Sequence, residues 1–147
     1  MVTTVRIPVH LRDEALSANG RQHWRVRATR ARILRNKSRL MHASAAREVG
    51  QLHPQRLHLT VHVTWPDRRR RDVANLSPTI KALVDGAIDA HVLPDDDDRH
   101  LIGPDLRVAQ AVTDAPGLAV LVFEWAAAPA PPVDANASTQ PIERAGR

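Results

Sequence analysis

The stretch LHLTVHVTWPDRRRRDVANLSPTIKALVDGAIDA, residues 57–90, decides the fold of this chain. In residues 57–65 apolar and polar side chains alternate, which is the period of a strand with one buried face. Apolar residues then recur at helical spacing from Leu76 to Ala87 and predict a helix that ends near Ala90. Between them lies a run of four arginines, Arg68, Arg69, Arg70 and Arg71. The stretch predicts a strand and a helix joined by a strongly basic loop.

Two further elements are expected upstream of this stretch. Val2–Leu11 is rich in β-branched residues and predicts a strand, in which Pro8 indicates a sheet edge or a bulge. A long helix is expected from about Trp24 to Val49. Its buried stripe, spaced at the helical period, is predicted to contain Ala31, Leu34, Ser38, Met41 and Ala45.

Downstream of the helix, Leu106–Thr113 and Leu118–Trp125 are predicted as two strands. The turn sequence Asp114–Gly117 lies between them and predicts a hairpin. The order strand, helix, strand, helix, hairpin favours an α+β fold, a single domain with a mixed β-sheet and packed helices. We expect this domain over residues 1–125 and a disordered tail rich in Pro and Ala over residues 126–147.

Composition limits the functional classes. The chain has 147 residues and no cysteine, which excludes disulfides and thiolate metal sites. Its apolar runs are shorter than the roughly 18 residues that a membrane span needs, and the N-terminus lacks the apolar region of a secretory signal. We therefore expect a soluble, cytoplasmic protein without a membrane partner.

Charge is distributed unevenly along the chain, whose net charge is +5. Residues 15–47 contain no Asp or Glu, whereas acidic residues gather between Asp85 and Asp105. Such asymmetry indicates a polyanion bound on one side and a metal on the other. Arg25 and Arg32 of the long helix, together with Arg68–Arg71, are the candidate DNA-phosphate ligands. The competing interpretation is a solvated arginine-rich face that only keeps the protein soluble.

The acidic run that follows the predicted helix, Asp95–Asp98, is the candidate metal site, together with Asp72 before the helix. Mg²⁺ takes a few carboxylates and completes its coordination with water, and it can activate a water and polarise a phosphate. Lys81 is expected either to reach a phosphate or to form an ordinary surface pair with Asp85 four residues later. The sequence does not decide whether the two acidic segments meet.

Aromatic and histidine side chains offer weaker signals. His58 and His62 share the polar face of their predicted strand, but roughly 13 Å separates residues four apart in a strand. They are therefore expected to be surface residues and not ligands of one ion. Trp24 is expected to anchor the core, although a wedge inserted into branched DNA is the alternative.

These motifs, taken in order, resemble the RusA family of Holliday junction resolvases. The matching segments are Pro66–Leu76, Lys81–Asp85 and Leu93–Asp96, and Asp85 and Asp96 are eleven residues apart, as in the family. The N-terminal segment Ser17–Asn19, followed by His23–Arg25, is similar to the family's Ser/Asn-rich segment before its first helix. The resemblance covers roughly residues 5 to 125, and it agrees in order, spacing and residue type together.

The resemblance implies a small homodimeric endonuclease that cuts four-way DNA junctions symmetrically, with Mg²⁺ as cofactor and Mn²⁺ as a substitute. Such proteins are usually encoded by phages or prophages, which places this one in the cytoplasm of a bacterial host cell. By residue, Asp72 matches the first motif aspartate and Asp96 the distal metal ligand, with Asp95 beside it. Lys81 matches the helix lysine. The implied catalytic set is Asp72, Asp96 and Lys81, and the implied metal set is Asp72, Asp95 and Asp96.

The chain departs from the family pattern in two places. Ala74 stands where the family has a second aspartate, and Ser77–Thr79 resembles an insertion of about one helical turn before Lys81. Asp67, Asp97 and Asp98 are candidates to replace the missing carboxylate, and Asn75 is a further candidate oxygen ligand or a helix cap.

Three functions stay open on sequence grounds. The first is the RusA-like endonuclease. The second is a catalytically impaired protein that binds branched DNA without cutting it, because Ala74 replaces a motif aspartate. The third is a basic regulator or phage structural protein in which both charge runs are solvated, and this one leaves the motif order unexplained.

Overall fold

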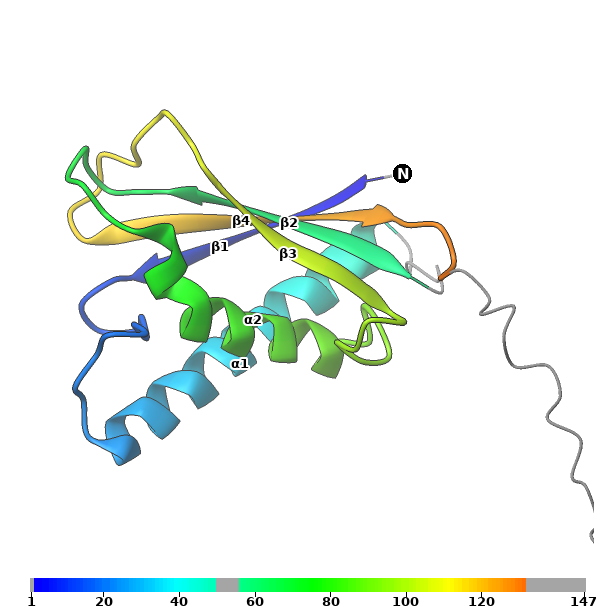
Figure 1. Ribbon diagram of the computed structural model, residues 1–147, viewed down its shortest axis with the longest axis horizontal. Helices are drawn as coiled ribbons and strands as arrows, with labels where there is room; N and C mark the ends of the chain where they lie inside the picture. The colour runs from blue at the N-terminus through cyan, green and yellow to red at the C-terminus, as the bar shows by residue number, and fades with distance from the viewer. Residues whose placement is uncertain (1, 50–55, 132–147) are drawn as a thin grey trace, which may run out of the picture.

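The alternating stretches of the sequence form one four-stranded sheet in the computed structural model, which describes residues 2–49 and 56–131 (Figure 1). The strands are β1 (Val2–His10), β2 (Leu57–Thr64), β3 (Leu101–Val108) and β4 (Leu118–Ala127). Their spatial order is β1-β4-β2-β3. β4 is antiparallel to both β1 and β2, whereas β2 and β3 run parallel. The expected mixed sheet is confirmed.

One face of the sheet is buried and the other is open, as the alternation of side chains predicts. Leu57, Leu59, Val61 and Val63 of β2 are each 1 % exposed or less. The inward residues of β4, which include Phe123 and Trp125, are fully buried. Pro8 lies in β1, an edge strand, where its missing N–H costs no ladder hydrogen bond.

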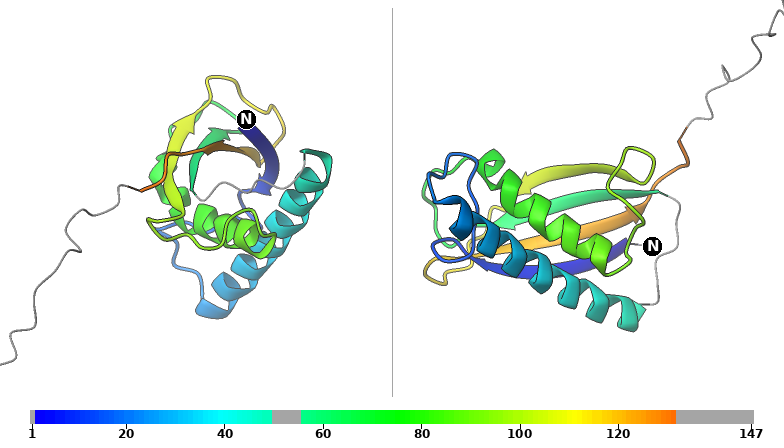
Figure 2. Two further views of the ribbon diagram at one scale, coloured as in Figure 1. Left: turned by 90° about the vertical axis from the view of Figure 1, so that its right-hand side faces the viewer. Right: turned by 90° about the horizontal axis from the view of Figure 1, so that it is seen from below.

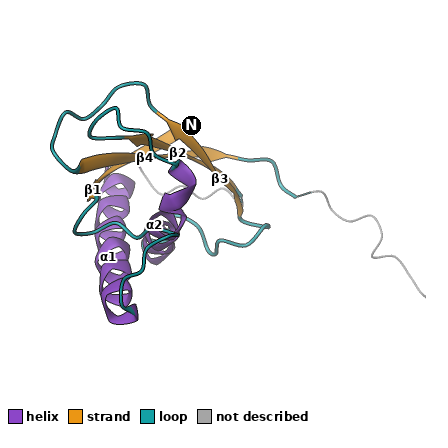
Figure 3. Cartoon of the chain, turned by 60° about the vertical axis from the view of Figure 1, so that its left-hand side comes forward, coloured by secondary structure: helices purple, strands orange, loops and turns teal. Residues whose placement is uncertain are grey.

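Two helices cover the buried face and form a second layer (Figure 2). They are α1 (Trp24–Val49) and α2 (Ser77–Asp89), and a short 3₁₀ helix, η1 (Val73–Leu76), leads into α2 (Figure 3). The α2 segment connects the parallel strands β2 and β3. The α+β domain predicted from the sequence is therefore confirmed, with the helices on a single side.

The two helices touch most closely at Gly86. A Cβ atom at this position would lie 2.2 Å from the Arg35 carbonyl oxygen and 2.7 Å from the Ser38 Cβ. Only a glycine permits this contact between helix backbones. Arg35 of α1 also forms a two-point ion pair with Asp89 of α2, at 2.5 and 2.7 Å. The sheet is thus covered by a pair of helices that are fixed to each other.

The buried stripe of α1 contains one polar cluster that the sequence did not indicate. Leu34 and Ser38 are fully buried as predicted, and His42 is also buried. Nε2 of His42 accepts the indole N–H of Trp125 at 3.0 Å, so the ring proton lies on Nδ1 and is donated to the Ser38 carbonyl oxygen. Burial lowers the pKa of His42 to about 4. A neutral imidazole is therefore part of the core.

The predicted hairpin is wrong. β3 begins at Leu101 and ends at Val108, and it pairs with β2 instead of β4. β2 lies between β3 and β4, so the turn at Asp114–Gly117 belongs to a longer connection from the sheet edge to its centre. Turn residues specify a local reversal of the chain, but they do not specify which strand becomes the neighbour.

The last strand continues past the expected domain boundary. Ala126 and Ala127 pair with Val2 of β1 and Leu57 of β2, respectively. The rest of the predicted tail, from residue 132 onward, lies outside the described residues. Among residues 2–49 and 56–131, neither helix has the length and apolar character needed to cross a membrane.

Candidate functional site

The arginine run forms the loop between β2 and η1, and Asp67 organises it. This carboxylate accepts hydrogen bonds from the Arg69 backbone N–H at 2.9 Å and from the Arg71 guanidinium at 2.7 and 3.2 Å. The hydrogen bond from Arg71, followed by that from the Arg69 amide, lowers the pKa of Asp67 to about 2. Asp67 is thus engaged by hydrogen bonds within its own loop.

The four arginines have different surroundings. The Arg71 guanidinium lies 5.2 Å from the centroid of the Trp65 ring, and its side chain is 21 % exposed. Arg71 therefore shapes the loop, whereas Arg68 and Arg70 are exposed and Arg69, also exposed, lies 3.8 Å from the Asp67 carboxylate.

Asp72 stands at the start of η1 with its carboxylate exposed. Its Oδ1 accepts the Ala74 backbone N–H at 2.9 Å and so caps the short helix. Among the described residues, its other carboxylate oxygen has no hydrogen-bond partner, so this oxygen is available to a further ligand. Asn75 does not cap a helix. Its side-chain oxygen accepts a hydrogen bond from Asn19 instead, at 3.1 Å.

Lys81 joins α2 to the acidic loop that follows it. Its Nζ donates to Asp85 Oδ1 at 2.8 Å and also contacts the Asp96 carboxylate. The hydrogen bonds to Asp85 and then to Asp96 raise the pKa of Lys81, and the hydrogen bond from Lys81 lowers that of Asp96. The surface pair with Asp85 exists, but the contact with Asp96 makes Lys81 the residue that draws the acidic loop back onto the helix.

The remaining acidic residues hold their own loop. Asp95 Oδ1 accepts the Asp96 backbone N–H at 2.8 Å, and Asp97 Oδ1 accepts the His100 ring N–H at 2.5 Å. Asp98 is exposed, and its carbonyl oxygen accepts a hydrogen bond from Arg56. The Asp97 carboxylate, like that of Asp67, is thus hydrogen-bonded to a side chain of its own loop, whereas the Asp98 carboxylate faces solvent.

The predicted metal ligands are not assembled as a closed centre. Within residues 2–49 and 56–131, no group of three or more His, Asp or Glu side chains is placed to hold a metal ion. Asp96 and Lys81 line a hollow of about 350 Å³ between α2 and β3, whereas Asp72 lines a second hollow at the beginning of α2. Asp72 and Asp95 are exposed and Asp96 is partly exposed. Carboxylates within reach of solvent fit Mg²⁺, which binds one or two of them and completes its shell with water and substrate phosphate.

The two arginines of α1 that the sequence suggests as DNA ligands, Arg25 and Arg32, are both exposed. Arg25 lies over the Trp24 ring, whereas two other arginines of the helix bond to backbone carbonyls. Arg27 donates to the Ser17 carbonyl oxygen at 3.3 Å, and Arg30 donates to that of Ala15 at 3.0 Å. The exposed side chains of α1 thus form a basic surface near the β1–α1 segment.

Trp24 is not a core anchor, and that prediction is wrong. Its side chain is 66 % exposed and lies under the Arg25 guanidinium, at 5.2 Å. Trp24 begins α1 and projects from its first turn, where the helix has not yet reached the sheet. His58 and His62 lie on the open sheet face as predicted, and each pairs with a different carboxylate, Asp105 and Glu124.

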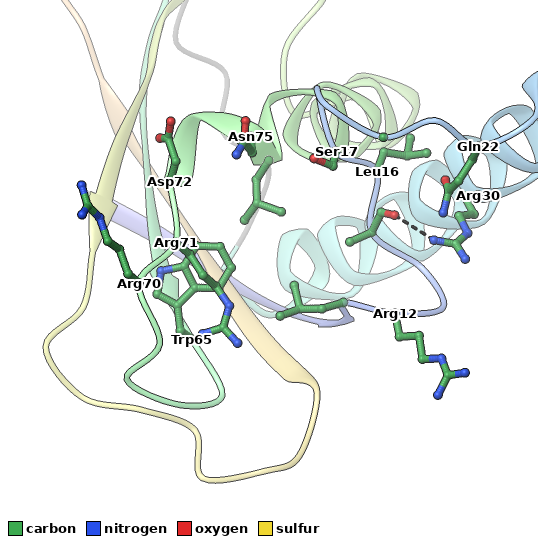
Figure 4. Close-up of a pocket in the computed structure, with 14 residues that line it drawn as sticks. Arg12, Leu16, Ser17, Gln22, Arg30, Trp65, Arg70, Arg71, Asp72 and Asn75 are labelled. Atoms are coloured by element: carbon green, nitrogen blue, oxygen red, sulfur yellow. Dashed lines mark hydrogen bonds between the residues drawn. The ribbon is translucent and has the colours of Figure 1, made fainter.

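Sequence reasoning missed the second hollow and most of its lining. Figure 4 shows it between the β1–α1 segment and the arginine loop, with Asp72 and Arg70 on one side and Arg12, Gln22 and Arg30 on the other. The sequence singled out Ser17–Asn19, Arg70, Asp72 and Asn75, but it gave no hint that the segment after β1 lies against Asn75.

No protein-family model matches this chain, and no curated protein matches it either.

Proposed function

We propose that this chain is a Mg²⁺-dependent, structure-selective endodeoxyribonuclease that resolves four-way DNA junctions by phosphodiester hydrolysis. The observation that carries the proposal is the contact of Lys81 with Asp96, since it brings a cation and a carboxylate from separate segments together on α2. Asp72 lies at the beginning of the same helical segment, directly after the exposed arginines. The order of these residues is the one in which the RusA-like motifs occur.

Each residue has a chemical role in this proposal. Asp72 and Asp96, with Asp95 beside them, would hold Mg²⁺, which when bound polarises the phosphate and activates a water. Arg68–Arg70 bind the phosphates of the strand that is cut. Lys81 exchanges its contact with Asp96 for a non-bridging phosphate oxygen, to which it donates a hydrogen bond. The products are a phosphate monoester and a free hydroxyl.

A homodimer is part of the proposal. Resolution of a junction requires two cuts in opposite strands, and the chain carries one set of these residues. Two copies would place two sites symmetrically on a four-way junction, with Arg25 and Arg32 binding the arms. Light scattering should then give a particle of twice the 16.3 kDa chain mass.

A second function is favoured by a specific observation. Ala74 supplies no carboxylate, and Lys81 neutralises Asp96, so the protein could bind branched DNA without cutting it. The experiment that separates the two uses a labelled four-way junction and a linear duplex of the same sequence, with Mg²⁺, with Mn²⁺ and with EDTA. Paired symmetric nicks in the junction alone, absent in EDTA, support the nuclease. Tight binding that survives EDTA, without nicks under either metal, supports the binding protein.

A further inference from the structure

The hollow beside Asp72 has the dimensions of a small-ligand site. Its volume is about 460 Å³, within the range of roughly 300–1,000 Å³ that such sites occupy. It lies between the segment after β1, the second turn of α1, the arginine loop and η1 (Figure 4). The lining residues do not include Lys81 or Asp96, so this hollow is separate from the one between α2 and β3.

The wall of the hollow is apolar. Leu16, Trp65 and Leu76 line it, and they are 4 %, 8 % and 5 % exposed, respectively. Leu11 and Ala15 complete this surface, and Arg71, whose guanidinium lies 5.2 Å from the centroid of the Trp65 ring, also lines the hollow. A buried apolar wall with an indole in it suits the faces of a flat ring, because such a ring loses little by leaving water.

The rim of the hollow is polar and mainly cationic. Arg12 and Arg70 are exposed at its edge, and Arg30 lines it from α1. The Arg30 Nη1 donates to the Ala15 carbonyl oxygen, which fixes the guanidinium and leaves further N–H groups to donate elsewhere. Gln22 and Ser17 add an amide and a hydroxyl. Cations beside an apolar wall match an anion attached to a flat, hydrogen-bonding ring.

The lining is held in place before any ligand arrives. The Leu16 backbone N–H donates to the Thr79 hydroxyl at 2.7 Å, and that hydroxyl donates to the Leu16 carbonyl oxygen, also at 2.7 Å. The Ala18 backbone N–H donates to the Asn75 carbonyl oxygen at 3.0 Å. The segment after β1 is therefore fastened to η1 and α2 in two places, which lowers the entropic cost of binding.

We propose that this hollow binds one unpaired nucleotide of a DNA strand. The base lies against Leu16, Trp65 and Leu76, and the phosphate lies against Arg12 and Arg30. Because Asp72 is on the rim, the bound nucleotide belongs to the strand that Asp72 helps to cut, and this placement rests on the proposed function. Every base is paired in an open four-way junction, but the pairs at the exchange point have lost a stacking neighbour. Extruding a base into the hollow therefore costs less there than within a duplex, so the hollow would select for branched DNA.

The first test uses free ligands and does not depend on cleavage. The full chain, labelled with ¹⁵N, is titrated with each deoxynucleoside 5′-monophosphate, with deoxyribose 5-phosphate and with inorganic phosphate. The chain has three tryptophans, so the indole signals of Trp24, Trp65 and Trp125 report on three locations. We expect the nucleotides to move the Trp65 indole and Gln22 amide signals, and to leave the buried Trp125 signal in place. Deoxyribose 5-phosphate and phosphate should leave the Trp65 signal unchanged.

Matched variants identify the phosphate ligand. Arg12→Gln should weaken nucleotide binding about tenfold, since it removes one hydrogen bond between charged groups. Arg6→Gln is the control, because Arg6 is an exposed arginine on the outward side of β1. Equal weakening in both variants, or Trp65 shifts that inorganic phosphate reproduces, would overturn the nucleotide site in favour of nonspecific anion binding.

The second test places the nucleotide in the strand. Four-way junctions are prepared with a single abasic residue at successive positions around the branch point. One position should slow cleavage by the wild-type protein at least about tenfold. Arg12→Gln should reduce that dependence, and Arg6→Gln should retain it. Cleavage that is equal at every abasic position overturns the inference. Nucleotide binding by a protein that cuts no junction retains the site and overturns the nuclease proposal instead.

Discussion

Among the residues of the proposed site, Lys81 has the most demanding position. It contacts Asp85 and Asp96 together, so it neutralises Asp96, a carboxylate that the proposed metal would need. Lys81→Met should therefore have opposite effects on metal binding and on catalysis: Mg²⁺ binding strengthens, while the rate of junction cleavage falls about a hundredfold because a phosphate oxygen loses its donor. Single-turnover cleavage and Mg²⁺ titration of the folded variant measure both.

A structural role for Lys81 predicts a different pattern. The Lys81–Asp85 ion pair lies at the surface, so its loss should change the free energy of unfolding by less than about 1 kcal/mol. Lys81→Arg restores the charge and serves as the control, with partial recovery of cleavage. A variant that loses cleavage only in proportion to lost folded protein would contradict the assigned role.

His42 gives a residue-scale prediction about pH. Its pKa is lowered to about 4 by burial, whereas the unfolded chain titrates near 6.5. Between pH 6.5 and about pH 4 the unfolded state binds a proton that the folded state does not, so the free energy of unfolding falls as the pH falls. Below about pH 4 both states bind this proton, and His42 lowers the free energy of unfolding no further. The total is about 3 kcal/mol. His42→Gln should flatten this part of the profile in urea unfolding at a series of pH values, and an unchanged profile would show that His42 is not the source.

At the scale of elements, sequence patterns identified what each segment becomes but not always its neighbours. The alternation in residues 57–65 predicted β2 and its buried face, because a strand with one buried side must alternate. The periodicity of Leu34 and Ser38 predicted the docked face of α1 in the same way. The pairing of β3 with β2 was missed, since β3 is an edge strand with exposed residues and no such alternation. A local turn signal then favoured the wrong partner.

The contact between α1 and α2 is a prediction at this scale. Gly86→Ala would place a methyl group 2.2 Å from the Arg35 carbonyl oxygen, so the helices must separate. We expect the free energy of unfolding to fall by about 1–3 kcal/mol. Chemical denaturation measures it. Gly117→Asn is the control, because that position opens to solvent and asparagine tolerates its positive φ. Equal stability of the two variants would exclude the close contact.

Within the arginine loop, one arginine should contribute to DNA binding and another to the stability of the fold. Arg68→Gln removes an exposed cation and should lower junction affinity, with a salt dependence that is weaker by about 0.9 in the log–log slope. Arg71→Gln removes the stack on Trp65 and the contacts with Asp67, and should lower the midpoint of thermal unfolding. Binding titrations over a range of salt and thermal melts of both variants check this division. Identical behaviour of the two arginines would contradict it.

In the whole molecule, segments that are distant in the sequence come into contact, and these contacts could not be predicted from the sequence. Order and spacing indicated Asp72, Lys81 and Asp96, but the fold decides that the acidic loop turns back onto Lys81 and that Asp67 and Asp97 are held by neighbours. The hollow lined by Arg12, Gln22 and Arg30 required the β1–α1 segment to lie against η1, a long-range contact that periodicity does not encode. Tertiary contacts of this kind depend on the entire chain.

We propose that Asp72 and Asp96, which precede and follow α2 in the sequence, act in one metal-dependent cut. The most direct measurement is the rate of four-way junction cleavage by Asp72→Asn and Asp96→Asn, with Asp114→Asn in an exposed turn as the matched control. Our account predicts that both site variants lose cleavage by more than about a hundredfold while they still bind the junction, and that the control cuts normally. Undiminished cleavage by either site variant would contradict the claim.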